Sequence, residues 1–328
     1  MRLLVFGQSG QVATELARRS PEAMFLSRSQ TDLADHRACA NAIRAYAPDG
    51  VINAAAYTAV DRAEENEALA MQINSEAPGI MARECAMLGI PLVHISTDYV
   101  FSGGGTAGWR PNDIAAPKNA YGRSKLAGER AITQGGAIHA ILRTSWVFSA
   151  HGSNFVNTML RLSRTRDALS IVDDQIGGPT YAADIAAACL TIAEQLRADP
   201  NKTGIYHYSG APDVSWRGFG EAIFALMDRK VSITGISTED YPTPAQRPLN
   251  SRLDCGTTET FFALQRPDWR AGLRDVLTEL GEIPACQISR ALSSPAAPAR
   301  DFIPLPSACR NSCYQSTTSQ WFTTPSRC

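Results

Sequence analysis

The residue types best suited to chemistry in this chain are a tyrosine and a lysine four positions apart, Tyr121 and Lys125. On a helix, side chains at this spacing share one face. A free tyrosine has a pKa of about 10, which is poor for acid–base work near neutrality. A nearby ammonium group favours the phenolate and lowers that pKa, so the pair can pass a proton to or from a carbonyl oxygen. The same spacing also occurs in ordinary surface pairs, which is the alternative interpretation.

A hydroxyl group upstream strengthens the chemical interpretation. The segment from Ile95 to Phe101 ends a predicted strand and carries hydroxyl groups at Ser96 and Thr97. A hydroxyl, a tyrosine and a lysine form the acid–base set of the short-chain dehydrogenase/reductase superfamily, which this combination resembles. We therefore expect Thr97, Tyr121 and Lys125 to form one catalytic group.

A glycine-rich turn near the start of the chain predicts a nucleotide site. Gly7 and Gly10 lie in the run Gly7–Ala13, directly after the first apolar stretch and at the start of a predicted helix. Glycine permits a tight turn and close approach of the backbone to a pyrophosphate, which a helix N-terminus attracts. The spacing is G-x-x-G-x-x-A rather than G-x-G-x-x-G, and many strand–helix turns contain two glycines. Its place at the start of a strand–helix alternation favours the cofactor interpretation.

The end of the second predicted strand bears on which cofactor binds. In nucleotide-binding sheets this turn contacts the adenosine ribose, where an acidic residue favours a free 2′-hydroxyl and arginine accommodates a 2′-phosphate. Arg28 stands at this place, and Asp32 and Leu33 follow where the adenine would lie. The turn favours NADPH, with NADH as the alternative, while Arg28 can also be an ordinary solvated arginine.

The scaffold that must position these residues is predicted by an alternation of apolar runs and helical patterns. Repeated strand–helix units imply a parallel sheet with helices on both faces, which binds ligands at the carboxyl ends of its strands. The fold class is therefore α/β, a Rossmann-type doubly wound parallel sheet with a smaller, helix-rich C-terminal lobe. The predicted strands are Met1–Phe6, Met24–Leu26, Gly50–Asn53, Pro91–Ser96 and Ala137–Arg143, and the helices are Gln11–Arg19, Arg37–Tyr46, Glu67–Leu88 and Tyr121–Thr133.

The remaining residues divide between the two lobes. A helix over Tyr181–Arg197 and a strand over Gly204–Tyr208 can return to the sheet, so the nucleotide-binding domain comprises residues 1–145 plus roughly 178–208. Residues 146–177 and 209–282 form the substrate lobe, with Ser215–Asp228, Val231–Ile236 and Trp269–Leu280 as its elements. Residues 283–328 lack lysine and are rich in Ser, Thr and Pro, which predicts a disordered tail.

Composition excludes several classes of protein. Lys and Arg number 31 against 32 Asp and Glu, a net charge of −1, which disfavours a nucleic-acid platform. No apolar run approaches the roughly 20 residues that span a bilayer, and we read no export signal at the start. Cysteines before the tail are isolated, which suits a reducing cytoplasm. A soluble cytoplasmic enzyme with a small-molecule substrate is expected, with no nucleic-acid or membrane partner.

Longer segments carry a more specific resemblance. In their order along the chain, they resemble the dTDP-4-dehydrorhamnose reductase family from Met1 to about Leu280. The segments are Asn53–Asp61, Ser96–Phe101, Tyr121–Glu129, Arg143–Phe148, Asn154–Val156, Asp174–Thr180 and Tyr241–Pro248.

The resemblance implies a reaction and roles for the catalytic group. The family reduces the 4-keto group of dTDP-4-dehydro-β-L-rhamnose with NAD(P)H, giving dTDP-β-L-rhamnose, the last step in the synthesis of that nucleotide sugar. Tyr121 is then the general acid that protonates the C4 oxygen. Lys125 binds the nicotinamide ribose and tunes Tyr121, and Thr97 hydrogen-bonds the sugar.

Further positions follow from the same resemblance. Asp98 and Trp146 match substrate contacts, although Trp146 can equally be a core aromatic. The cofactor positions are Gly10, Gln11 and Val12 in the pyrophosphate turn, Ala56, Tyr57 and Thr58 in the loop after the third strand, and Ile95.

One candidate cation concerns the substrate. The substrate diphosphate requires a positive charge, and Arg247 is the candidate because guanidinium suits bidentate phosphate contacts; it can also be a solvent-exposed loop arginine.

Some family members form dimers through magnesium held by glutamates. Glu15 and Glu279 fall at matching places, but the third position is Ala183, so we expect no metal here, while a homodimer through other contacts stays possible.

Two other functions stay open at this point. One keeps the fold and changes the sugar, giving another nucleotide-sugar reductase or an epimerase. The other is a non-catalytic partner resembling the regulatory β subunit of methionine adenosyltransferase. Tyr121 and Lys125 together speak against that second alternative.

Overall fold

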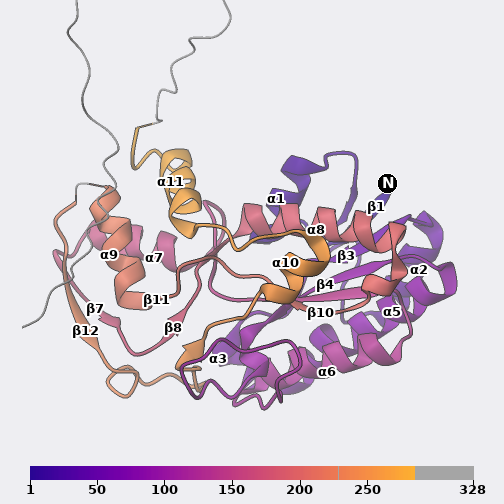
Figure 1. Cartoon of the computed structure of the whole chain (residues 1–328), viewed down its shortest axis with the longest axis horizontal. Coiled ribbons are helices and arrows are strands. Elements are labelled where there is room, and N and C mark those ends of the chain that lie inside the picture. Colours follow the sequence, from indigo (N-terminus) through magenta and orange to yellow (C-terminus); the bar gives the residue numbers. More distant parts are fainter. Residues whose placement is uncertain (228, 285–328) are drawn as a thin grey trace, which may run out of the picture. The chain divides into compact units, whose positions relative to one another are not determined.

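A computed structural model describes residues 1–227 and 229–284 of the chain (Figure 1). Its centre is a six-stranded parallel sheet with strand order β10-β5-β4-β3-β1-β2. The predicted α/β class is confirmed. The strands are β1 (Leu3–Phe6), β2 (Met24–Leu26), β3 (Gly50–Asn53), β4 (Leu92–Thr97), β5 (His139–Thr144) and β10 (Gly204–His207).

The sequence of β1 shows why the sheet is covered on both faces. All four residues of Leu3–Phe6 are buried, as expected for a strand with helices above and below it. Leu3 and Val5 pack into one apolar cluster with Leu16 and Ile185. Leu4 and Phe6 point to the opposite face and pack with Ile43 and Met81.

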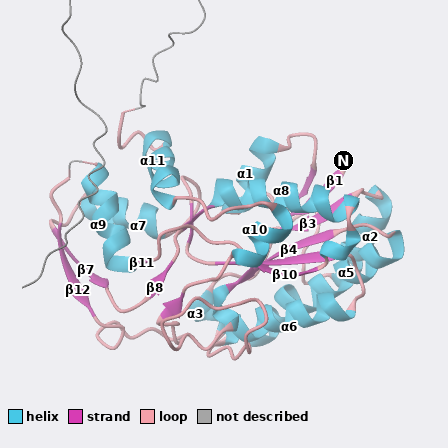
Figure 2. Cartoon of the chain, in the orientation of Figure 1, coloured by secondary structure: helices cyan, strands magenta, loops and turns pink. Residues whose placement is uncertain are grey.

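Two layers of helices provide these faces (Figures 1 and 2). One layer consists of α1 (Gln11–Arg19) and α8 (Ala182–Ala198), and the other contains α2 (His36–Tyr46), α5 (Ala77–Leu88) and α6 (Ala120–Gln134). The strand order reverses between β1 and β3, since the chain leaves β1 for the edge strand β2 and returns to β3 on the other side. Ligands of such sheets bind at this switch point, beyond the carboxyl ends of the strands.

The predicted helix Glu67–Leu88 is interrupted. It consists of α4 (Glu67–Met71), a π-helical turn η1 (Gln72–Glu76) and α5. A π turn inserts extra backbone into a helix and is frequent at functional sites. Here it carries Asn74, which is buried and bonded to the loop after β3. Most other predicted elements are shifted by only one or two residues.

The rest of the chain forms short sheets and helices around a separate apolar cluster. The helices α7 (Phe155–Ser163), α9 (Trp216–Leu226) and α11 (Trp269–Glu279) enclose that cluster, which includes Phe219 and Leu273. Val231–Ile236, expected in a helix-rich lobe, is mostly strand: β12 (Ser232–Ile236) pairs in parallel with β7 (Ala168–Val172). Alternating burial along β7 favours this pairing.

Smaller elements complete the description. The strands are β6 (Val147–Phe148), β8 (Ile176–Gly177), β9 (Thr180–Tyr181), β11 (Val214–Ser215) and β13 (Asn250–Ser251). The helices are α3 (Val60–Ala63), α10 (Gly256–Phe262) and the short turns η2 (Asp98–Val100) and η3 (Pro200–Lys202). None of the helices in residues 1–227 and 229–284 is long and apolar enough to cross a membrane. The predicted tail lies outside the described residues, apart from Ile283 and Pro284.

Candidate active site

The start of α6 brings Tyr121, the expected general acid, against the turn η2 that follows β4. The Asn119 side chain caps the helix by accepting a hydrogen bond from the Gly122 amide at 2.8 Å. A Cβ on Gly122 would collide with the Tyr99 carbonyl oxygen in η2. Glycine at this position therefore allows the close approach of α6 to η2. Tyr121, beside Gly122, packs edge to face on Tyr99 at 5.6 Å between ring centroids.

Thr97 and Asp98 lie where β4 ends, next to this tyrosine. The Thr97 hydroxyl donates to Asp98 Oδ1 at 3.1 Å and is close enough to the Tyr121 phenol to lower its pKa by hydrogen bonding. Burial nevertheless dominates: together with the Asp98 carboxylate it raises the pKa of Tyr121 above its usual value. Asp98 is 3% exposed, and burial raises its own pKa to about 6.

Lys125 lies one turn further along α6, and its amine does not point to the phenol. Nζ is 2.7 Å from the Ile95 carbonyl oxygen and 3.0 Å from His94 Nε2. Burial lowers the pKa of Lys125 to about 8. The expectation that Lys125 lowers the pKa of Tyr121 is therefore wrong for this structure. The burial of the phenol and its proximity to Asp98 decide the direction instead.

A cleft opens at the switch point of the sheet; Thr97, Tyr121 and Lys125 do not line it, and its connection to them is Tyr57, which packs on the same alanines as Tyr121. The cleft has a volume of about 330 Å³ and is lined by three segments that were expected to bind the cofactor, Phe6–Gly10, Leu26–Leu33 in part, and Ala54–Thr58. Gly7 has φ +113°, and a Cβ there would lie 3.3 Å from the Ala54 backbone. Gly10 caps α1 without a side-chain hydrogen bond among the described residues, which leaves amides of the first turn available to an anion. These features fit a dinucleotide.

The loop after β3 is pinned to the catalytic helix. Asn74 accepts from the Tyr57 amide at 2.8 Å and donates to the Tyr57 carbonyl oxygen at 3.0 Å. Its amide also donates to Ser124 Oγ at 3.0 Å, and Ser124 donates to the Tyr121 carbonyl oxygen. Ala56, Tyr57 and Thr58 thus line the cleft in a position fixed relative to Tyr121. Sequence reasoning did not single out Asn74.

The other residues predicted to bind the cofactor differ in how deeply their side chains are buried. Arg28, Asp32 and Leu33 all line the cleft. The Arg28 side chain is 78% exposed and pairs with Asp32 at 3.2 Å through its Nε atom. Val12 is buried in the apolar core, so only its backbone faces the turn. Ile95 contributes its carbonyl oxygen to Lys125.

Trp146 lies in an aromatic stack next to the strand ends. Its backbone has φ +48°, unusual for a bulky residue. Its indole stacks on Trp216 with ring centroids 3.6 Å apart. The indole is also close to Gly177, where a Cβ would lie 3.0 Å from Trp146 Cε2. Trp216, which sequence reasoning missed, therefore fixes the plane of Trp146.

Arg247 reaches the site from the Pro-rich segment. Its NH2 group pairs with Asp61 Oδ2 at 2.6 Å, and its guanidinium lowers the pKa of the Tyr99 phenol against the raising effect of burial. The buried NH1 atom of Arg247 has no hydrogen-bond partner within the described part of the chain. The arginine is 18% exposed on its side chain, so it is not a freely solvated loop residue.

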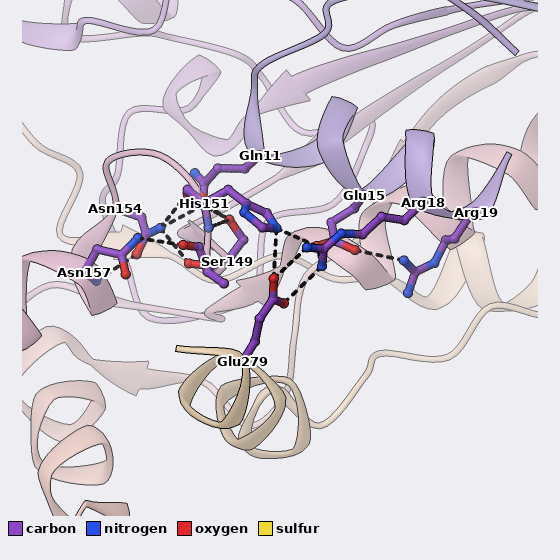
Figure 3. Close-up of polar contacts among 10 residues, drawn as sticks. Gln11, Glu15, Arg18, Arg19, Ser149, His151, Asn154, Asn157 and Glu279 are labelled. Atoms are coloured by element: carbon purple, nitrogen blue, oxygen red, sulfur yellow. Dashed lines mark hydrogen bonds and ion pairs between the residues drawn. The ribbon is translucent and has the colours of Figure 1, made fainter. Parts of the chain in front are cut away.

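Gln11 joins the start of α1 to the segment after β6 (Figure 3). Its Oε1 atom accepts from Ser149 Oγ at 2.8 Å and from Asn154 Nδ2 at 3.0 Å. The side chain therefore fixes the glycine-rich turn relative to residues 149–154, and Gln11 itself does not line the cleft.

The two glutamates at the positions of the family's magnesium ligands do come together. Atoms of Glu15, Glu279 and His151 lie within 4.8 Å of one another. Arg18, however, pairs with Glu279 at 2.6 Å and with Glu15 at 3.3 Å, and Arg19 pairs with Glu15 at 2.9 Å (Figure 3). Carboxylates already neutralised by two guanidinium groups do not fit a hard divalent ion, which requires several oxygen ligands. Ala183 is buried and offers no ligand atom.

Taken together, the structure places Thr97, Asp98 and Tyr121 close to one another, while the Lys125 amine is bonded to Ile95 and His94. Tyr57 and Tyr121 pack against the same small cluster of alanines. His94 and Asn53 are functional candidates that sequence reasoning missed. Both are polar and fully buried in strands, which only the three-dimensional arrangement reveals.

Comparisons with known proteins agree with this geometry. Residues 1–282 match the family described as the RmlD substrate binding domain. The chain is 42% identical over 289 residues to a dTDP-4-dehydrorhamnose reductase of Sinorhizobium fredii, covering 85% of this chain and 98% of that protein. A solved dTDP-4-dehydrorhamnose reductase of Clostridium acetobutylicum superposes with a TM-score of 0.80 at 32% identity, covering 86% of this chain and 100% of that one. One from Bacillus anthracis, solved in complex with NADP, gives 0.79 at 34% identity, with coverages of 85% and 99%.

Proposed function

The chain belongs to the RmlD substrate binding domain family, and we propose that it reduces the 4-keto group of dTDP-4-dehydro-β-L-rhamnose to give dTDP-β-L-rhamnose. The observation that carries this proposal is the proximity of the Thr97 hydroxyl to the Tyr121 phenol at the end of β4, together with the cleft lined by Gly7, Gly10 and Tyr57, since Tyr57 packs on the same alanines as Tyr121. A proton donor close to a cleft with a glycine-rich turn suits the reduction of a ketone by a dinucleotide.

NADPH is the proposed cofactor. It supplies a hydride to C4 of the sugar when it is bound. Gly7 and Gly10 would hold its pyrophosphate at the start of α1, and Arg28 has guanidinium nitrogens available for a 2′-phosphate, since only its Nε atom pairs with Asp32. The NADP complex of the Bacillus anthracis relative supports this choice.

Tyr121 is the proposed proton donor. Its raised pKa keeps the phenol protonated before the reaction, which is the state a donor requires. As negative charge develops on the C4 oxygen, Tyr121 gives its hydroxyl proton to that oxygen. The Thr97 hydroxyl donates to Asp98 and lies close to the phenol; by turning from Asp98 it can donate to the phenolate that forms, and it orients the ketone.

The substrate is proposed to bind over the strand ends. The buried Oδ2 atom of Asp98 lacks a hydrogen-bond partner among the described residues, although Ser251 lies close enough to lower the pKa of this carboxyl, and we propose that it accepts from a sugar hydroxyl. Trp146 offers an edge of its stacked indole to the sugar. Arg247 has a free NH1 for the diphosphate and is held in place by Asp61.

A direct assay tests this function. Purified protein is mixed with NADPH and freshly prepared dTDP-4-dehydro-β-L-rhamnose, and the absorbance of the reduced cofactor is followed while NMR identifies the product. Stoichiometric oxidation with formation of dTDP-β-L-rhamnose is the expected result. NADPH binding without turnover, as in a regulatory subunit, or turnover only with another nucleotide sugar, would contradict the proposal.

A further inference from the structure

A buried chain of hydrogen bonds connects the loop after β3 to the catalytic lysine. Asn53 Nδ2 lies 3.0 Å from His94 Nδ1, and His94 Nε2 lies 3.0 Å from Lys125 Nζ. The three side chains come from β3, β4 and α6, and each residue is 1% exposed. The mechanism proposed above gives no task to Asn53 or His94.

The orientation of the Asn53 amide determines how this chain can be protonated. Its Oδ1 atom accepts a hydrogen bond from the Ala55 amide at 3.2 Å, so Nδ2 faces His94 and donates to Nδ1. A neutral imidazole has one donor and one acceptor nitrogen. Since Nδ1 of His94 accepts, Nε2 must carry the proton. An imidazolium is excluded because its Nδ1 could not accept from Asn53, and because burial lowers the pKa of His94 well below its usual value.

The consequence falls on the lysine. A protonated Nε2 of His94 is a donor, and it needs an acceptor at Lys125 Nζ. An ammonium group has no lone pair and cannot accept, whereas a neutral amine can accept from His94 and still donate to the Ile95 carbonyl oxygen at 2.7 Å. All the hydrogen bonds of the chain are thus satisfied only when Lys125 is neutral.

The charges around the lysine do not override this preference. Glu129 on α6 raises the pKa of Lys125, while burial acts in the opposite direction and is the larger effect. The Glu129 carboxylate is already taken by Arg143 on β5, at 2.9 and 2.6 Å, and by Ser96. His139 on β5 also disfavours the charged form of His94.

We propose that Asn53 and His94 are positioning residues that bias Lys125 towards its neutral amine until the lysine leaves His94. This inference rests on the role proposed above for Lys125. A neutral Lys125 leaves the Tyr121 phenol protonated and ready to donate. When Lys125 instead turns to hydroxyl groups of the nicotinamide ribose, it takes up one proton from solvent, and the resulting ammonium favours the Tyr121 phenolate.

The lysine can be observed directly because the chain has only four lysines, Lys118, Lys125, Lys202 and Lys230. The full-length protein is labelled with ¹³C at lysine Cε, and its signals are titrated by NMR without any ligand. Lys125→Arg assigns the signal of Lys125. We expect its midpoint at about 8 or lower, against about 10.4 for ordinary lysines, and we expect ¹⁵N shifts of His94 that report the proton on Nε2 above this midpoint.

Two substitutions test the chain itself. His94→Gln offers Lys125 a carbonyl oxygen without adding charge, so the midpoint of Lys125 should rise. Asn53→Asp should move the His94 proton to Nδ1 and raise the midpoint by about one unit or more. His139→Gln removes a buried histidine whose ring hydrogen-bonds only to the Ala137 carbonyl oxygen among the described residues and which acts on His94 through charge alone; as the matched control it should move the Lys125 midpoint much less than His94→Gln does.

The outcomes separate this inference from the proposed function. A Lys125 signal that titrates with the other three lysines, or a midpoint unmoved by His94→Gln in the folded protein, would overturn the chain. If a variant fails to fold, the titration of Lys125 and the tautomer of His94 in the wild-type protein still test whether the hydrogen-bond chain favours neutral Lys125. Both are measured on the free protein, so they give the same answer whichever nucleotide sugar the enzyme reduces.

Discussion

Replacing Gly177 with alanine should damage substrate binding while sparing the cofactor. The new Cβ would lie 2.9 Å from Ser251 Cβ and 3.0 and 3.1 Å from Trp146 Cε2 and Nε1. The movement of Trp146 is restricted, because its ring is stacked on Trp216 with centroids 3.6 Å apart. The backbone of Gly177 is itself paired with β11 and β13. One of these groups must therefore move.

The size of the effect follows from the crowding. Inserting a methyl group into a packed site costs about 1–3 kcal/mol, which corresponds to roughly 5- to 150-fold in a rate or affinity. If Trp146 is the group displaced and it contacts the sugar, Gly177→Ala should lower kcat/KM for the nucleotide sugar by about tenfold or more. Steady-state kinetics, with NADPH titrated separately by fluorescence, measures both quantities.

A second glycine provides the control. Gly104 is exposed, lacks a left-handed backbone, and a Cβ there would have only one neighbour within 4 Å, at 3.8 Å. Gly104→Ala should therefore behave as wild type. A Gly177→Ala protein with unchanged kcat/KM would show that Trp146 does not position the substrate, and the aromatic stack would then be merely part of the core.

Four further substitutions test the roles of Asp98, the Arg247–Asp61 pair and Arg28. The pKa of Asp98 is raised to about 6, so the stability that its protonated form provides is lost as the pH rises through 6. Asp98→Asn should then be more stable than wild type at pH 8, by up to about 3 kcal/mol, and not at pH 4; thermal unfolding at both values checks this, and equal melting temperatures at pH 8 would argue against it. Arg247→Lys removes the guanidinium, and Asp61→Asn removes the carboxylate that holds it, so each should raise KM for the nucleotide sugar about tenfold or more. An unchanged KM in both variants would show that Arg247 does not bind the diphosphate. Arg28→Ala should weaken NADPH more than NADH in binding titrations, and equal losses for the two cofactors would exclude a contact with the 2′-phosphate.

The sequence predicted the scaffold better than the details of the site. Apolar runs such as Leu3–Phe6 and amphipathic helices such as α1 are local patterns, and they gave the elements of the sheet almost residue by residue. The π turn at Gln72–Glu76 was not predicted because nothing in its composition distinguishes it from a regular helix. Its wide turn exists to place Asn74 against the loop at Tyr57, a contact 17 residues away in sequence.

The same distinction holds for the site. Tyr121, Thr97 and the glycine turn were identified from residue type and position. The predicted lowering of the Tyr121 pKa was wrong, because spacing along a helix cannot show that Lys125 Nζ is hydrogen-bonded to His94 and Ile95. Trp216, Asp61 and His94 were missed since each acts through a partner far away in the chain, Trp146, Arg247 and Lys125 respectively.

The most direct test of the central claim is the turnover of Tyr121→Phe with NADPH and dTDP-4-dehydro-β-L-rhamnose. The phenyl ring keeps the packing on Tyr99, and only the proton donor is removed. We predict that most turnover is lost, while NADPH affinity, measured by fluorescence titration, stays close to that of the wild type. A variant that reduces the ketone at the wild-type rate would show that another group protonates the C4 oxygen and that Tyr121 is not the proton donor.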